Sequence, residues 1–187
     1  MPHILRIKNM VCPRCIRVVQ EELEKLRYEV LRIQLGEVQI AEENPDTDAI
    51  KQVLEAQGFE LLEDRNAQWI EQVKNLIIHL VQNDQFGQLK QNLSTYLSEK
   101  TGKDYSFLSH LFSAVEGITI EKYLILQKIE RAKELLIYDE ETLSEIAFRL
   151  GYSSTAHLSG QFKQVTGQNP SEFKKQTGVR RRFLDEI

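Results

Sequence analysis

The first sixty residues change between the hydrophobic patterns of strands and of amphipathic helices. Residues 4–9 alternate between apolar and polar positions, as in a strand with one buried face. Apolar residues then recur at helical spacing from Cys15 to Leu26. Two further strands are expected at Glu29–Leu35 and Glu37–Ala41, with Gly36 at the tight turn between them.

A second helix and a last strand complete this segment. Asn44-Pro45-Asp46 breaks the chain and offers a helix cap. Ile50, Val53 and Leu54 then form a buried stripe, Gly58 ends the helix, and residues 59–62 supply the strand. The order strand, helix, strand, strand, helix, strand predicts a ferredoxin-like α+β domain over residues 1–63.

From Glu63 onward the pattern predicts helices only, after a polar seam at Asp64–Gln68. The expected helices are Trp69–Val81, Gln88–Lys100, Asp104–Val115, Glu121–Ile137, Thr142–Leu150, Thr155–Val165 and a final piece after Pro170. A short helix, a glycine-containing turn and another short helix occur twice. We therefore expect an all-α domain with two helix-turn-helix units joined by one long helix.

The domain boundaries follow from these patterns. Residues 64–87 hold a linker and the first helix of the helical domain, residues 88–178 the two helix-turn-helix units, and residues 179–187 a basic tail. No apolar run approaches the roughly 20 residues of a membrane span. The first residues lack the long apolar stretch of a secretory signal, so we expect a cytoplasmic protein.

Charge argues against a strongly basic DNA-coating protein. The net charge is −4, all of it in residues 1–68, where 13 acidic residues oppose 9 basic ones. The remainder is neutral. No grouping of catalytic residues and no phosphate-binding loop is recognisable, so no enzyme is expected.

The second helix-turn-helix unit is the clearer one. Its first helix has an apolar stripe, and Gly151 can take the backbone conformation of the turn. Leu158 and Phe162 anchor the next helix from inside. The outward residues of that helix, which in such a unit meet base edges in the major groove, are Thr155, Ala156, Ser159, Gly160 and Lys163.

The stretches DYSFLSHLFSAVEGITIEKYLILQKIERAKELL and TLSEIAFRLGYSSTAHLSGQFKQVTGQNPSEFKK strongly resemble the double helix-turn-helix domain of AraC/XylS-type transcription regulators. The matching core and turn residues are Phe112, Gly117, Tyr123, Ala132, Leu135, Ile146, Ala147, Gly151, Phe162, Gly167 and Pro170. The resemblance implies binding of double-stranded DNA. RNA polymerase and a second copy of the chain are further candidate partners. The resemblance also implies DNA contacts from Phe107, Ser109, His110 and Ser113 of the first unit.

The sequence departs from this family at two positions. The family commonly has arginine, the best bidentate reader of guanine, at the places of His110 and Gly160. His110 can also be an ordinary surface residue. The remaining candidate cations are Lys163, Lys174, Lys175 and the run Arg180–Arg182, which can contact phosphates or simply keep a tail soluble.

Cys12 and Cys15, the only cysteines, form a CxxC pair at the expected start of a helix. In a reducing compartment such a pair indicates a metal or redox site. The helix N-terminus, with Arg14 and Arg17, is expected to stabilise the thiolates. Two sulfur ligands favour Cu(I), while Ag(I), Hg(II), Cd(II) and Zn(II) stay open.

The segment Asn9–Cys15, with the predicted strand order and Gly58-Phe59-Glu60, resembles heavy-metal-associated domains of copper chaperones and copper-pumping ATPases. That resemblance implies that Cys12 and Cys15 bind the ion, that Met10 packs beneath the loop, and that Phe59 lies close by. The two halves together predict a metal-responsive transcription regulator. A copper-delivery protein with a helical interaction module and a thiol-redox regulator are the alternatives.

Overall fold

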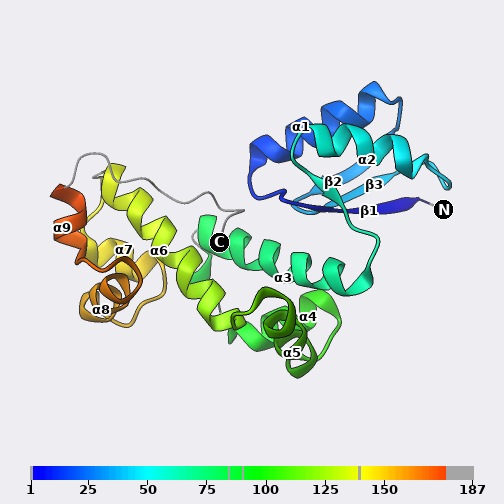
Figure 1. Ribbon diagram of the computed structural model, residues 1–187. Helices are drawn as coiled ribbons and strands as arrows, with labels where there is room; N and C mark the ends of the chain where they lie inside the picture. Colours follow the sequence, from blue (N-terminus) through cyan, green and yellow to red (C-terminus); the bar gives the residue numbers. More distant parts are fainter. Residues whose placement is uncertain (1, 84, 90, 139, 176–187) are drawn as a thin grey trace. The chain divides into compact units, whose positions relative to one another are not determined.

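The computed structural model describes residues 2–83, 85–89, 91–138 and 140–175 (Figure 1). The chain divides into two compact units, residues 1–75 and 76–187. The division falls inside one helix, α3 (Arg65–Gln82). The tail run Arg180–Arg182 lies outside the described residues.

The first unit has the predicted order of elements. They are β1 (His3–Lys8), α1 (Pro13–Lys25), β2 (Val30–Gln34), β3 (Glu37–Ile40), α2 (Thr47–Ala56) and β4 (Glu60–Leu61). The strands form one antiparallel sheet in the order β2-β3-β1-β4. β1 is therefore a central strand, and its C-terminal end leads directly into the cysteine segment.

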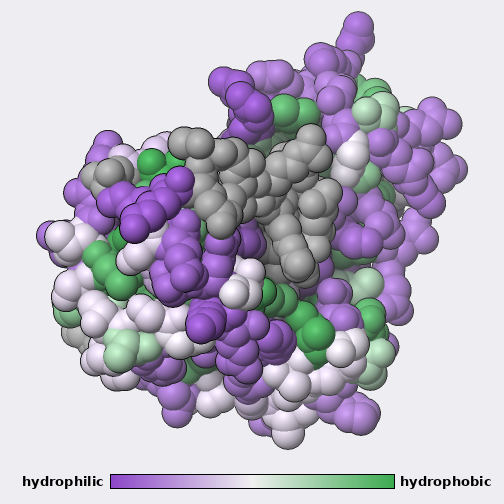
Figure 2. Space-filling model, turned by 60° about the vertical axis from the view of Figure 1, so that its left-hand side comes forward, coloured by the Kyte–Doolittle hydropathy of each residue, from purple (hydrophilic) through white to green (hydrophobic). Residues whose placement is uncertain are grey.

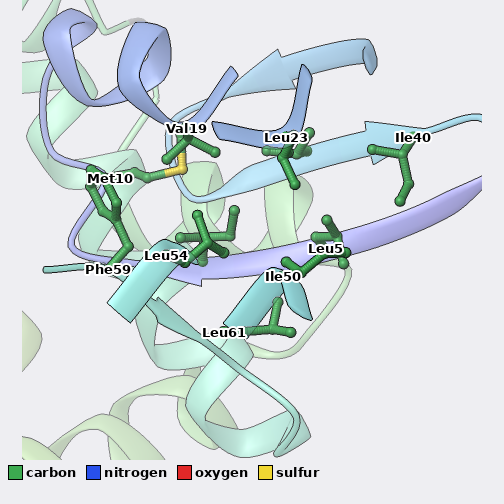
Figure 3. Packing of buried hydrophobic residues seen from close by; sticks show 11 residues of the cluster. Leu5, Met10, Val19, Leu23, Ile40, Ile50, Leu54, Phe59 and Leu61 are labelled. Atoms are coloured by element: carbon green, nitrogen blue, oxygen red, sulfur yellow. The ribbon is translucent and has the colours of Figure 1, made fainter. Parts of the chain in front are cut away.

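The core of this unit lies between the sheet and the two helices on one of its faces (Figures 1 and 3). Leu5 and Ile7 point inward from β1, while Arg6 and Lys8 form ion pairs with Glu37 and Glu60 of the neighbouring strands. This alternation is the one that the sequence predicts for a half-buried strand.

The second unit is helical throughout its described part. After α3 come a short 3₁₀ turn η1 (Phe86–Gln88), α4 (Leu93–Thr101), α5 (Tyr105–Glu116), α6 (Ile120–Tyr138), α7 (Leu143–Arg149), α8 (Thr155–Thr166) and α9 (Pro170–Lys175). The pairs α4–α5 and α7–α8 are the two predicted helix-turn-helix units. The long helix α6 joins them.

Two predicted helix starts are wrong. The helix expected from Gln88 begins at Leu93, because the Asn92 side chain accepts a hydrogen bond from the Thr95 amide, at 2.8 Å, and caps the helix there. The helix expected from Trp69 begins at Arg65, because Asp64 caps it by accepting from the Ala67 amide, at 2.8 Å. The predicted polar seam is therefore mostly the first turn of α3.

Within the described residues, no helix is long and apolar enough to cross a bilayer. Hydrophobic residues appear in small patches among hydrophilic ones on the face shown in Figure 2. Among the residues that the structure describes, the most exposed large apolar side chain is Phe148 of α7, with 79% of its surface accessible.

Candidate nucleic-acid interface and cysteine pair

The second helix-turn-helix unit is fixed at each of its joints. Thr142 and Glu145 form a reciprocal capping box at the start of α7. Gly151 has φ +68°, a conformation that glycine adopts without the steric cost of a side chain, and it turns the chain between the helices. Ser154 then caps α8 by accepting from the His157 amide, at 3.1 Å.

The inner face of α8 is held by aromatic and aliphatic packing. Leu158 and Phe162 are fully buried, and the ring of Phe162 meets that of Phe173 edge to face, with 5.4 Å between centroids. Because this face is buried, the opposite face of the same helix points away from the core.

The residues predicted to read DNA from α8 lie on or beside that outward face. Ala156, Gly160 and Lys163 are exposed, whereas Thr155 and Ser159 are partly buried. A Cβ atom added at Gly160 would meet no heavy atom within 4 Å. The helix therefore has room for a larger side chain at Gly160, and Lys163 supplies its only Lys or Arg cation.

The first helix-turn-helix unit (α4–α5) shows the same division between inner and outer faces. Leu108 and Phe112 of α5 are buried, and Phe112 meets Tyr123 of α6 edge to face at 5.5 Å. Of the predicted contact residues, Phe107 and His110 are exposed, while Ser109 and Ser113 are partly buried. This helix carries no lysine or arginine.

The length of α6 suits the spacing that two DNA-reading helices need. Its 19 residues span about 28 Å at about 1.5 Å per residue. α5 contacts α6, and α7, α8 and α9 also pack on it (Figure 1). Recognition helices in successive major grooves lie about 34 Å apart. The length of α6 is close to this separation, so a rigid helix of this length can hold two such helices at nearly the required distance.

His157 is a further candidate that the outward stripe of the sequence did not include. It is exposed in the first turn of α8, with its ring Nδ1 3.2 Å from the Ser153 hydroxyl. The same ring meets the Tyr152 ring edge to face, with 5.2 Å between centroids. These two contacts hold a polar ring at the N-terminal end of α8. In helix-turn-helix units, the residues at this end of the recognition helix contact base edges in the major groove.

A buried lysine lies next to the second helix-turn-helix unit (α7–α8). Lys128 of α6 is 6% exposed, and its Nζ lies 3.5 Å from the centroid of the Phe86 ring and 5.1 Å from that of Tyr152. Burial lowers the pKa of Lys128 to about 7. The two aromatic faces offset part of that cost, because a desolvated cation–π contact contributes about 2 kcal/mol. The sequence placed this lysine on a helix but gave no sign of its burial.

We expect Lys128→Met to stabilise the folded chain by about 1–2 kcal/mol near pH 7, because it removes a buried charge. The lowered pKa means that the unfolded chain binds more protons than the folded chain above about pH 7. Wild-type stability should therefore rise with pH, and the advantage of the variant should shrink by about 1–2 kcal/mol by pH 9. Urea unfolding at both pH values measures this. A gap that does not change with pH, or an equal gap for the exposed Lys122→Met, would contradict it.

The cysteine pair occupies the start of α1. Cys12 is the N-cap residue and accepts hydrogen bonds at its backbone oxygen from the amides of Cys15 and Ile16. Pro13 is the first helical residue, where its missing amide hydrogen costs nothing. The two sulfur atoms lie 3.3 Å apart, and both side chains are partly exposed.

The expectation that this site stabilises both thiolates is wrong for Cys15. Burial, followed by the hydrogen bond with Cys12, raises the pKa of Cys15, and the backbone amides offset this only in part. Arg17 forms an exposed ion pair with Glu21, at 3.8 Å. Cys15 is therefore a protonated thiol at neutral pH in the metal-free chain.

This pKa shift predicts the alkylation of metal-free protein. The thiolate is the nucleophile, so the rate at which iodoacetamide modifies Cys15 in the folded chain should keep rising, by up to about tenfold per pH unit, beyond pH 9. In the urea-unfolded chain the same rate should level off near the ordinary thiol pKa of about 8.5. Mass spectrometry of the Cys15 peptide measures both, and levelling off in the folded chain at or below the pH at which the unfolded chain levels off would refute the shift.

The other residues assigned to this site lie in the core beside it. Met10 is fully buried, and Phe59 lies next to it at one end of the cluster (Figure 3). Met10 therefore packs beneath the loop. Among the described residues, no group of three or more His, Cys, Asp or Glu side chains is arranged to hold a metal ion.

Residues 97–176 match a protein-family model described as a helix-turn-helix domain. An uncharacterized HTH-type transcriptional regulator of Staphylococcus aureus is 37% identical over 78 residues, which cover 42% of this chain and 10% of the relative. The Msm operon regulatory protein of Streptococcus mutans is 27% identical over 119 residues, covering 62% of this chain and 40% of that protein. The chain thus spans about a tenth of the first relative and two fifths of the second.

Among solved structures, the C-terminal domain of AraT, a response regulator from Geobacillus stearothermophilus, matches with a TM-score of 0.51. It is 23% identical, and the match covers 64% of this chain and 97% of that one. At this identity the likeness is one of fold. Together with the sequence matches, it confirms the helix-turn-helix architecture that the sequence indicated for the helical half. The C-terminal half of the chain therefore carries a helix-turn-helix domain with the fold of the AraT C-terminal domain.

Proposed function

We propose that this chain is a transcription regulator that binds specific sequences of double-stranded DNA. The observation that carries the proposal is the pair of helix-turn-helix units, each with a buried inner face and an exposed outer face, joined by a helix of suitable length. The proposed contact residues are Phe107, Ser109, His110, Ser113, Thr155, Ala156, Ser159, Gly160 and Lys163, with His157 added.

The outer faces of α5 and α8 carry one lysine and no arginine. Few phosphate contacts imply weak non-specific binding and a shallow dependence on salt. A single copy of this domain would therefore hold DNA modestly. Contacts with a second copy of the chain, or with RNA polymerase, would add to the binding free energy of the DNA complex. These are the partners that we propose.

We further propose that the first unit is a ferredoxin-like domain of the heavy-metal-associated kind and that Cys12 and Cys15 bind a soft metal ion. Cu(I) suits two thiolates because it accepts low coordination numbers. Metal–sulfur bonds of about 2.3 Å allow one ion to join two sulfur atoms up to about 4.6 Å apart, and these lie 3.3 Å apart. Metal occupancy would control DNA affinity through a difference in metal affinity between two states of the chain.

A thiol-redox regulator is the second candidate, and the 3.3 Å separation of the sulfur atoms favours it as well. A disulfide needs about 2.05 Å between the two sulfur atoms, so oxidation would have to bring them closer together. Oxidation to a disulfide removes both sulfur ligands, and it would therefore abolish metal binding. The metal regulator therefore needs both cysteines reduced in order to respond, whereas the redox regulator responds when they are oxidised.

Footprinting tests the proposal. A duplex is first selected from a random library by the wild-type chain, and its protection is then compared with and without one equivalent of Cu(I) under reducing conditions. We expect a bounded footprint whose strength depends on Cu(I) in the wild type and not in Cys12→Ser/Cys15→Ser. Failure to select any sequence would refute DNA reading. A response to oxidant, with none to Cu(I), would favour the redox regulator.

A further inference from the structure

Asn9 joins the cysteine loop to helix α3. This residue follows the last residue of β1 and has φ +70°, a left-handed conformation that few residues other than glycine adopt. Its backbone amide donates a hydrogen bond to Glu71 Oε1, at 3.1 Å, and its side-chain Nδ2 donates to the Gly58 carbonyl, at 3.0 Å. Both bonds connect the base of the loop to segments about fifty or more residues away in the sequence.

Glu71 is well placed to hold that connection. It lies on α3 and is only 6% exposed. Burial of a carboxylate costs little free energy only when hydrogen-bond donors satisfy its oxygen atoms. One turn further along α3, Asn75 fills the space above Gly36 at the β2–β3 turn, where a Cβ atom would lie 2.1 Å from Asn75 Nδ2. The first part of α3 is therefore fitted against two loops of the same sheet.

The helix carries this contact out of the first unit. α3 is continuous from Arg65 to Gln82, while the boundary between the units follows Asn75. From Glu71 to Gln82 the helix runs about 16 Å at about 1.5 Å per residue. Ile77 and Val81 in this second part are fully buried. The same helix therefore supplies Glu71 to the first unit and buried side chains to the helical unit.

Metal binding would move the loop on the side of Asn9. An ion held by two sulfur atoms at about 2.3 Å needs them about 3.7–4.6 Å apart, from tetrahedral to linear geometry, so the 3.3 Å separation must widen. Cys15 lies within α1, whose Val19 and Leu23 are fully buried, whereas Cys12 precedes the helix. The movement would accordingly fall on Cys12 and the residues before it.

We infer that Glu71 is a positioning residue that couples the metal-binding loop to α3 through the amide of Asn9. The inference rests on the proposed binding of metal by Cys12 and Cys15. It gives the two units a direct means of communication, because loop movement changes the hydrogen bond at Asn9 and thereby the setting of a helix that both units share.

Hydrogen–deuterium exchange on the full-length chain, with and without one equivalent of Cu(I), tests this. Glu71→Met removes the acceptor at similar size, Glu71→Gln leaves a weaker neutral acceptor, and Glu63→Gln makes the same charge change at an exposed neighbour. In metal-free protein, we expect the Asn9 amide to exchange about tenfold faster in Glu71→Met and less so in Glu71→Gln. Glu63→Gln should match the wild type.

With Cu(I), exchange along residues 65–82 should change in the wild type and in Glu63→Gln, change less in Glu71→Gln, and stay constant in Glu71→Met. If circular dichroism finds Glu71→Met unfolded, the reduced response of Glu71→Gln decides. An undiminished α3 response in the folded Glu71 variants, or none in Cu(I)-loaded wild type, overturns the coupling and leaves metal binding intact. Absence of Cu(I) binding by the wild type, or equal binding by Cys12→Ser/Cys15→Ser, overturns the metal site and the coupling with it.

Discussion

Phe162→Ala is expected to destabilise the second helix-turn-helix unit by about 3–5 kcal/mol, the usual cost of removing a fully buried phenylalanine ring. Phe162 has no exposed surface, and it packs against Phe173 at 5.4 Å between ring centroids. Because it anchors the inner face of α8, its loss would also release the outer face from a fixed orientation. Urea unfolding followed by helical circular dichroism measures the change, and DNA protection should weaken in parallel.

Phe148→Ala is the matched control. This phenylalanine lies on α7, in the same unit, but 79% of its surface is exposed, so its removal should change the free energy of unfolding by less than about 0.5 kcal/mol. Equal destabilisation by the two variants would mean that α8 does not pack on the unit through Phe162.

Gly160→Arg should tighten DNA binding by about 5- to 150-fold, because a good arginine contact with a base contributes about 1–3 kcal/mol. Gly160 is exposed on the outer face of α8, its φ lies outside the left-handed region, and nothing within 4 Å obstructs a side chain. The change replaces the helical glycine with arginine, the residue that the resemblance to AraC/XylS-type regulators implies at this position. The logarithm of affinity against the logarithm of salt should become steeper by about one unit.

Two controls separate charge from the other consequences of removing this glycine. Gly160→Ala should stabilise α8 by about 0.5–1 kcal/mol and leave the salt dependence unchanged. Gly160→Gln adds a neutral side chain of comparable length. If Gly160→Arg binds the selected duplex no more tightly than Gly160→Gln, with the same salt dependence, the outer face of α8 does not meet DNA.

Much of this fold could be read from the sequence because its signals are local. The alternation in β1, the turn at Gly36 and the cap at Asp46 each predict their element without reference to distant residues. The start of α4 was misplaced because residues 88–92 are compatible with helix, and only the hydrogen bond from the Thr95 amide to Asn92 fixes the boundary.

The parts that the sequence did not reveal depend on tertiary contacts. Lys128 looks like a surface residue of a long helix, yet it is buried between Phe86 and Tyr152. Desolvation of Cys15 reverses the direction that a helix N-terminus alone would give to its pKa. The bond between Asn9 and Glu71 joins residues 62 positions apart, and no periodicity can predict it. The outward residues of α8 could be predicted because helical geometry separates the two faces, whereas those of α5 were implied by the family resemblance.

We propose that metal at Cys12 and Cys15 changes the affinity of the helix-turn-helix domain for DNA. The measurement that tests it most directly is the dissociation constant for the selected duplex, by fluorescence anisotropy under reducing conditions. It is taken with and without one equivalent of Cu(I), for the wild type and for Cys12→Ser/Cys15→Ser. We predict a change of about 5- to 150-fold on adding Cu(I) to the wild type, the usual range of coupling between two sites, and none in the variant. The same dissociation constant in all four samples would contradict the account.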